Sequence, residues 1–339
     1  MTARTLPDGQ CVRHGRDAGV EVFRFVMAML VILLHILPDA TWSSSDPWGS
    51  PRWVVVADAL CRCAVPFFFL ISGYYFRAER GAVQNSRRAI VRLLPIYVFW
   101  SVCYLVAAYV ASGGRLGPWR WLRLLEGGGP AFHLWFLPAL LFALITLSLS
   151  LELGGRRLAI LVAATFALGG PILSDYHALL GIDSYSSHLN DVRRQLAAPA
   201  FVVIGYLLKT MPPIAIRTSL ALCALAFAGL LAERTILILS VGNPALVNSD
   251  GLLGTFCFGT AVFLLARSLN DAHWIRPFAW LGRISLAVFL CHLFLLWIVL
   301  TVIPPIPGRT LVCFVLIATG AIATALVLVR IPRLRRFTT

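Results

Sequence analysis

An arginine and a histidine interrupt the hydrophobic stretch VFRFVMAMLVILLHI, which covers residues 22–36. An ionisable side chain at the centre of a membrane helix costs about 2.5–3.5 kcal/mol on insertion scales, so such residues are candidates for function. Arg24 and His35 are eleven residues apart. In an α-helix this spacing returns them to within about 20° of one face and separates them by about 16 Å along the axis. They therefore share a stripe but cannot touch.

Glu21 lies one helical turn before Arg24 and is expected to form an ion pair with it. The alternative to a functional stripe is structural. In that interpretation Arg24 extends its side chain to the membrane interface, and His35 donates a hydrogen bond to a neighbouring carbonyl. The first helix alone does not decide between these two interpretations.

A second polar pair occurs in the next hydrophobic segment, ADALCRCAVPFFFLISGYYF. Asp58 and Arg62 are four residues apart and lie toward the membrane face where His35 is expected. Pro66 then interrupts the hydrogen-bond ladder, and Ser72 with Gly73 marks a second weak point. Broken membrane helices are tolerated where the freed backbone faces protein or water. We therefore expect the first two segments to line a polar cavity together.

Two further histidines lie in later hydrophobic segments. His133 and Trp135 open the segment FHLWFLPALL, which Pro138 is expected to kink, and His292 lies in the middle of GRISLAVFLCHLFLL. Taken alone, a residue such as His292 is more often a hydrogen-bonded core histidine than a ligand. No two histidines have the i, i+4 spacing of a helical zinc site, so no metal site is predicted.

The composition indicates an all-α polytopic membrane protein. Of the 339 residues 59% are hydrophobic and 13% are charged, against about 25% charged in soluble domains. We predict a single domain over 1–339, with a polar arm at 1–18, a ten-helix bundle at 19–330 and a basic tail at 331–339. At about 20 residues per crossing, the predicted spans are 19–38, 54–76, 90–111, 133–152, 157–173, 196–209, 214–232, 251–267, 280–300 and 310–330.

The net charge of +14 does not indicate a nucleic-acid partner, because arginines that flank membrane helices produce the same surplus. Their distribution over the loops favours both termini in the cytoplasm. Three outer loops, at 39–53, 112–132 and 174–195, combine aromatic and polar residues. Their tryptophans are either interfacial anchors or surfaces that face a saccharide.

Four sequence blocks in order resemble the acyltransferase-3 family of bacterial multi-pass membrane O-acyltransferases. They are Glu21 with Arg24, ten residues and His35; VPFFFLISGYYF at 65–76; HLWFL at 133–137; and SLAVFLCH at 285–292. The resemblance covers most of the chain. Within the family, this chain is most similar to the branch that O-acetylates surface polysaccharides. It implies an integral enzyme of the bacterial cytoplasmic (inner) membrane. The implied reaction moves an acyl group from cytoplasmic acyl-CoA, most often acetyl-CoA, to a saccharide hydroxyl.

The chain departs from the family pattern at two places. The family commonly has Arg-x-x-Arg before Leu-Pro, whereas this chain has RRAIVRLLP, in which Ala89 stands three residues before Arg92 and the nearest partners are Arg87 and Arg88. Phe289 replaces the usual tyrosine of the late block and removes a hydroxyl. At both positions the family's residue roles therefore carry over to this chain less directly.

The expected roles follow from the resemblance and from the positions along the helices. His35 is expected to act as general base, with Asp58 orienting its ring and Arg62 stabilising the oxyanion; an acyl-histidine intermediate stays open. Arg24 is expected to guide the donor. The other expected contacts are Arg88, Arg92 and Glu21 for the donor, and His133, Trp135, Ser72 and His292 for the acceptor.

The competing interpretation is a transporter or flippase for a lipid-linked saccharide that uses the same polar cavity. Transporters often contain paired halves with broken helices at matching positions, and no convincing later counterpart of Pro66 is visible. Succinyl transfer is an alternative to acetyl transfer, although no additional basic residue is clearly placed to hold a second carboxylate. The expected partners are the lipid bilayer, acyl-CoA and a saccharide, with no permanently bound cofactor and no nucleic acid.

Overall fold

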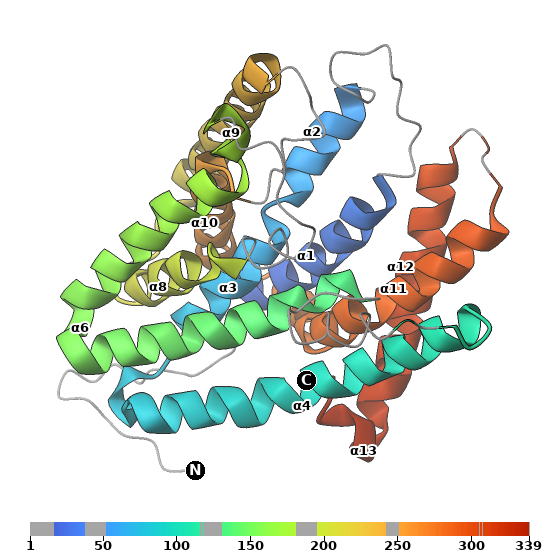
Figure 1. The fold of residues 1–339 in the computed structure, drawn as a ribbon. Coiled ribbons are helices and arrows are strands. Elements are labelled where there is room, and N and C mark those ends of the chain that lie inside the picture. The colour runs from blue at the N-terminus through green and yellow to red at the C-terminus, as the bar shows by residue number, and fades with distance from the viewer. Residues whose placement is uncertain are drawn as a thin grey trace.

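The computed structural model describes residues 17–37, 52–115, 117, 131–180, 195–241, 251–304, 306 and 308–338. All regular elements in these ranges are helices (Figure 1). The α-helices are α1 (Ala18–Ile36), α2 (Arg52–Cys61), α3 (Ala64–Tyr74), α4 (Ala82–Ala111), α6 (Phe136–Ser174), α8 (Ala198–Leu208), α9 (Ile216–Val241), α10 (Leu253–Ser268), α11 (Ser285–Val302), α12 (Arg309–Arg330) and α13 (Pro332–Arg335). The 3₁₀ helices are η2 (Ala78–Arg80), η3 (Phe132–Trp135), η4 (Tyr176–Leu180) and η6 (Arg276–Arg283).

The protein is an all-α polytopic membrane protein, as predicted. Seven helical stretches in the described ranges are long and apolar enough to cross a membrane, while α8 and α10 are shorter apolar helices. Each of the ten predicted spans overlaps one of these helices or one leg of α6. The number of crossings and the cytoplasmic side of the termini stay predictions. The arm before residue 17 and most of the three outer loops lie outside the described residues.

Two glycines divide α6 into two legs that run in different directions (Figure 1). Gly155 has φ 62° and ψ −155°, a conformation that side chains with a Cβ rarely adopt. The turn separates the predicted spans 133–152 and 157–173. Pro138 lies in the first turn of α6, directly after η3. Since a first-turn N–H has no helical partner, Pro138 fits this position without interrupting α6, and the kink predicted at Pro138 was wrong.

The predicted break at Pro66 is confirmed between α2 and α3. Proline lacks an N–H, and its ring clashes with the carbonyl four residues earlier, which is that of Arg62. The amide of Arg62 still donates to the carbonyl oxygen of Asp58 at 3.2 Å, and the ladder resumes where Phe67 donates to Cys63 at 3.0 Å. The break therefore places Asp58 and Arg62 in the last turn before an interruption of the helix.

Helix α4 begins eight residues before the predicted span 90–111. Its first amide, at Ala82, donates to Glu152 Oε2 at 3.1 Å, which satisfies one of the unpaired N–H groups at the helix start. Arginine and glutamine are good helix formers, so the polar sequence continues the helix beyond its apolar part. Arg87, Arg88 and Arg92 therefore all lie on this helix, the first two before the predicted span.

The basic tail packs against α4. The ring of Phe337 stacks on that of Phe99 with centroids 4.4 Å apart, and the indole N–H of Trp100 donates to the carbonyl oxygen of Phe337 at 3.0 Å. Thr338 is almost completely buried. Residues 331–338 are thus fixed to the helix that carries Arg88 and Arg92.

Helices α3 and α8 approach each other through two glycines. A Cβ on Gly73 would collide with the backbone oxygen of Val202, and one on Gly205 would collide with that of Leu70. Such contacts let two membrane helices pack backbone to backbone, which is a common mode of association in lipid. Neither helix can move aside without disturbing the packed core around it.

Gly73→Ala is therefore expected to lower the free energy of unfolding by about 1–3 kcal/mol or more, which is typical of overpacking. The measurement is thermal unfolding of detergent-solubilised protein. Gly229→Ala in α9 is the matched control, because a Cβ there meets no atom within 4 Å. Equal melting temperatures of the two variants would contradict the tight packing of α3 on α8.

Candidate active site

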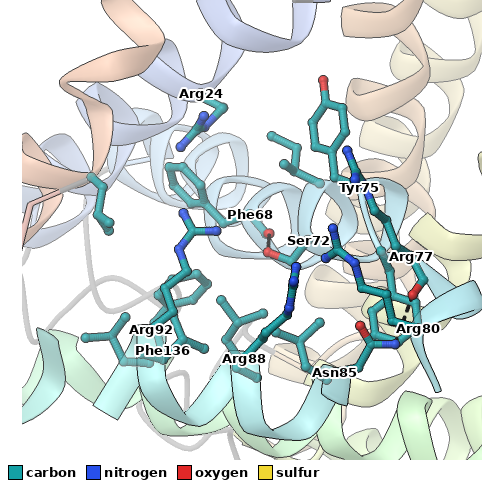
Figure 2. A pocket seen from close by; sticks show the side chains of 18 residues that line it. Arg24, Phe68, Ser72, Tyr75, Arg77, Arg80, Asn85, Arg88, Arg92 and Phe136 are labelled. Atoms are coloured by element: carbon teal, nitrogen blue, oxygen red, sulfur yellow. Dashed lines mark hydrogen bonds between the residues drawn. The ribbon is translucent and has the colours of Figure 1, made fainter. Parts of the chain in front are cut away.

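Five arginines converge on a cavity of about 300 Å³ that borders α1, α3, η2, α4 and α6 (Figure 2). Arg24 comes from α1, Arg77 and Arg80 from the segment around η2, and Arg88 and Arg92 from α4. Arg88 and Arg92 are four residues apart, so helical periodicity places both on the cavity side. The pattern RRAIVR therefore presents two guanidiniums to one space despite the missing Arg-x-x-Arg spacing.

The cavity carries a strong positive charge. Arg24 forms an ion pair with Glu21, in which Nη1 lies 3.2 Å from Oε2, as the sequence predicted. Desolvation and the positive charges of Arg88 and Arg77 lower the pKa of Arg80, although an arginine stays protonated in any protein. Guanidiniums that repel one another in this way favour a ligand with several negative charges.

The remaining walls of the cavity are mostly apolar. Ser72 lies among them, and its hydroxyl donates to the carbonyl oxygen of Phe68 at 2.8 Å. The side-chain amide of Asn85 donates from Nδ2 to the carbonyl oxygen of Arg77 at 2.9 Å, and this bond holds the start of η2 against α4. The apolar lining residues are Phe68, Ile71, Phe76, Ala89, Leu93, Phe136, Leu137, Leu140, Leu144 and Leu286.

Three histidines from α1, η3 and α11 meet inside the bundle. The rings of His35 and His292 lie parallel, with an interplanar angle of 2° and centroids 5.4 Å apart. The centroids of His133 and His292 are 5.0 Å apart, and Phe132 packs edge-on against His35 at 4.9 Å. The imidazole of His35 therefore faces the protein interior and not the surrounding lipid.

The protonation of His292 follows from its hydrogen bond. Its Nδ1 lies 2.6 Å from the carbonyl oxygen of Phe289, and because a carbonyl only accepts, this nitrogen must carry the proton. In the neutral ring Nε2 then has a lone pair. Within the described part of the chain, this nitrogen and both ring nitrogens of His133 are buried without a hydrogen-bond partner. Buried polar atoms of this kind are suited to bind a hydroxyl group.

Asp58 is the centre of a second ion-pair cluster. Its Oδ1 lies 2.8 Å from Arg62 Nη2, which confirms the predicted pair, and its Oδ2 lies 2.7 Å from Arg234 Nη1. Arg234 of α9 also donates to the carbonyl oxygen of Val55 at 3.1 Å. The cluster joins α9 to the α2–α3 break. The orientation of His35 by Asp58 and the oxyanion role of Arg62 stay predictions.

The four residues predicted to contact the acceptor are divided among three places. His133 and His292 lie with His35, whereas Ser72 lines the arginine cavity. Trp135 packs on Phe69 with ring centroids 6.2 Å apart and borders a much smaller hollow together with Arg62.

Sequence reasoning did not include three arginines in the site. Arg77 and Arg80 directly follow the block SGYYF, and their closeness to a family motif was the available signal. Arg234 lies 176 residues after Asp58, and no local pattern connects the two. No group of three His, Cys, Asp or Glu side chains among the described residues is arranged to hold a metal ion.

The family model described as an acyltransferase domain matches residues 17–330 of this chain. The chain belongs to the acyltransferase-3 family. Its membership agrees with a buried histidine in a membrane bundle beside a basic cavity, and it makes this protein a membrane acyltransferase. No solved structure matches the chain.

Curated relatives of this acyltransferase include a serine/alanine racemase of Enterococcus gallinarum, which is 30% identical over 165 residues, 45% of this chain and 22% of the relative. Two amino-acid racemases of Enterococcus faecalis are 25% and 23% identical, over 52% and 58% of this chain. The matched part is 24% and 28% of their lengths. The chain thus matches about a quarter of each relative, and the activity in their names describes those whole proteins.

Asp58→Ala is expected to destabilise the folded protein, because it leaves the guanidiniums of Arg62 and Arg234 facing each other. Breaking a buried ion pair costs about 3–5 kcal/mol, and the three side chains here are only 12–16% exposed. Thermal unfolding in detergent measures the effect. Asp271→Ala is the control, because its pair with Arg276 is exposed and long at 3.9 Å. An unchanged melting temperature of Asp58→Ala would contradict the structural role.

Proposed function

We propose that this acyltransferase transfers an acetyl group from acetyl-CoA to a hydroxyl of a cell-envelope saccharide. The observation that carries the proposal is the arrangement of two sites on the same elements. Arg24 and His35 both belong to α1, and α11 contributes Leu286 to the cavity wall and His292 to the histidine group. A donor that binds at the arginines can therefore extend toward the histidines along the helices.

The arginine cavity fits the charge of coenzyme A. This donor carries a diphosphate and a separate phosphate, and guanidinium groups bind phosphate oxygens in a bidentate manner. Arg88 and Arg92 are the proposed principal contacts, with Arg24 placed to guide the donor and Glu21 holding Arg24 in position at 3.2 Å. Arg77 and Arg80 add two positive charges at the same cavity.

The proposed transfer begins when His35 removes the proton from the acceptor hydroxyl. The oxygen then forms a bond with the acyl carbon of the thioester, the carbon–sulfur bond breaks, and the sulfur of coenzyme A takes the proton from His35. Arg62 is proposed to stabilise the oxyanion formed between these steps. Atoms and charge balance, since the products are one ester and one thiol.

The histidines beside His35 are proposed to bind the acceptor. The unpaired Nε2 of His292 accepts a hydrogen bond from one hydroxyl, and a saccharide has several such groups within a few ångströms. His133, whose ring centroid lies 5.0 Å from that of His292, offers one donor and one acceptor. Trp135 and Ser72 contribute only if the acceptor or donor extends into their separate hollows.

The proposed location is the bacterial cytoplasmic membrane, with both termini and the arginine cavity on the cytoplasmic side. Acetyl-CoA is made in the cytoplasm, and the distribution of arginines over the loops favours this orientation. The histidine group then lies deeper in the membrane, where an acceptor can approach from the other side.

His35→Ala is expected to leave a folded, membrane-inserted protein that no longer acetylates envelope glycans. Loss of a general base usually costs about 10²–10⁴-fold in rate. Mass analysis of glycans from cells that express each variant measures the product. His273→Ala, which changes an exposed histidine outside the site, is the control. Wild-type product in the His35 variant would refute the proposed base.

Arg88→Ala and Arg92→Ala are each expected to raise the KM for acetyl-CoA by about 10–100-fold, because a hydrogen bond to a charged group contributes about 1.5–3 kcal/mol. The measurement is the initial rate of the detergent-solubilised enzyme over a range of donor concentrations. Arg217→Ala, at the exposed start of α9, is the control and should not change the KM. Unchanged KM values in both cavity variants would contradict the donor site.

A further inference from the structure

Three phenylalanines lie between the arginine cavity and the histidine group. The ring centroids of Phe68, Phe136 and Phe289 are 5.8, 6.2 and 5.5 Å apart in the three pairs, so each ring contacts the other two. They come from α3, α6 and α11, respectively. We name these three rings the aromatic layer.

One side of the aromatic layer faces the cavity. Phe68 and Phe136 are among its lining residues (Figure 2). The other side contacts the histidines, because the ring of Phe289 lies 5.4 Å from that of His133 and 6.0 Å from that of His292. Phe136 and Phe289 are 5% and 3% exposed, which leaves little space around them.

The same order occurs along two elements. On α11, Leu286 lines the cavity, Phe289 belongs to the layer and His292 lies with His35. With a rise of 1.5 Å per residue, these steps are about 4.5 Å each. Along η3 and α6 the order is His133, then Phe136, then Leu140 at the cavity. The layer thus lies between the cavity and the histidines His133 and His292, the second of which stacks on His35.

We propose that the aromatic layer is the filter that selects the acyl group, admitting small uncharged groups such as acetyl and excluding long or anionic ones. This inference rests on the proposed function, since it takes acyl-CoA as the donor. The acyl group is the leading end of the donor when the phosphates bind at the arginines. It must therefore pass between the three rings before the thioester carbonyl reaches His35.

Packing explains selection by size. Protein interiors are as dense as organic crystals. Because the arm of coenzyme A follows the acyl group between the rings, a longer acyl chain finds room beside the histidines only if Phe289 is displaced. Forcing additional methylene groups into a packed site typically costs about 1–3 kcal/mol. An acetyl group adds only one methyl beyond the carbonyl, and a small rotation of Phe289 or Phe68 accommodates it.

Desolvation explains selection by charge. A carboxylate that enters an apolar site without a partner pays a large desolvation cost. The three rings of the aromatic layer have no polar side-chain atom that could pair with a carboxylate, whereas the arginines lie on the cavity side of the layer. A succinyl group would therefore stay at the arginines, with its thioester short of His35.

The test compares acyl donors in membrane vesicles that contain the protein and the host's envelope glycans. Acetyl-, butyryl-, hexanoyl- and succinyl-CoA are supplied singly, and acylated glycan is quantified by mass spectrometry. Wild-type protein should favour acetyl-CoA. Phe289→Ala should raise the rate with butyryl-CoA relative to acetyl-CoA at least tenfold, and succinyl-CoA should gain much less. Phe289→Leu, which disturbs folding less, should give a smaller change in the same direction.

Phe258→Ala is the matched control, because it removes a buried ring that belongs neither to the cavity nor to the layer. It should leave the ratio of butyryl to acetyl transfer unchanged. Equal ratios in wild type and both Phe289 variants would overturn the filter, as would efficient hexanoyl or succinyl transfer by the wild type. If the wild type acylates glycan with none of the donors, the proposed function fails, and the filter fails with it.

Discussion

The cost of placing charge in an apolar interior is the constraint on which this structure depends. Each described carboxylate or guanidinium well inside the bundle has a partner that reduces this cost, as in the pairing of Glu21 with Arg24 and of Asp58 with Arg62 and Arg234. Near His35 the chain uses imidazoles, which can be neutral, in place of permanent charges. The arginines that line the cavity are thereby separated from the group formed by His35, His133 and His292.

Much of this arrangement could be predicted from the sequence, because it depends on local spacing. The separation of eleven residues from Arg24 to His35, the separation of four from Asp58 to Arg62, and the position of Pro66 all concern a single helix or a single helix break. The ion pairs of Arg24 and Arg62 and the break before Pro66 are confirmed. The four ordered sequence blocks also predicted the family correctly.

The rest depends on contacts between distant segments, which spacing does not determine. Nothing near Arg234 indicates that its guanidinium contacts Asp58, and nothing near Phe289 indicates that Phe68 and Phe136 lie beside it. Hydropathy also misplaced the start of α4, since a polar sequence can continue a helix beyond the membrane. His292 illustrates the difference well: considered alone it is an ordinary core histidine, and only tertiary packing brings it against His35.

The contact between the tail and α4 has a consequence for biosynthesis. Phe337 and Trp100 are separated by 237 residues, yet their hydrogen bond and the stacking of Phe337 on Phe99 hold the helix that carries Arg88 and Arg92. The ribosome therefore makes Phe337 long after it has made Phe99 and Trp100. The nascent protein can thus insert its early helices long before residue 337 is made, and the tail can fasten α4 only after that residue has been synthesised.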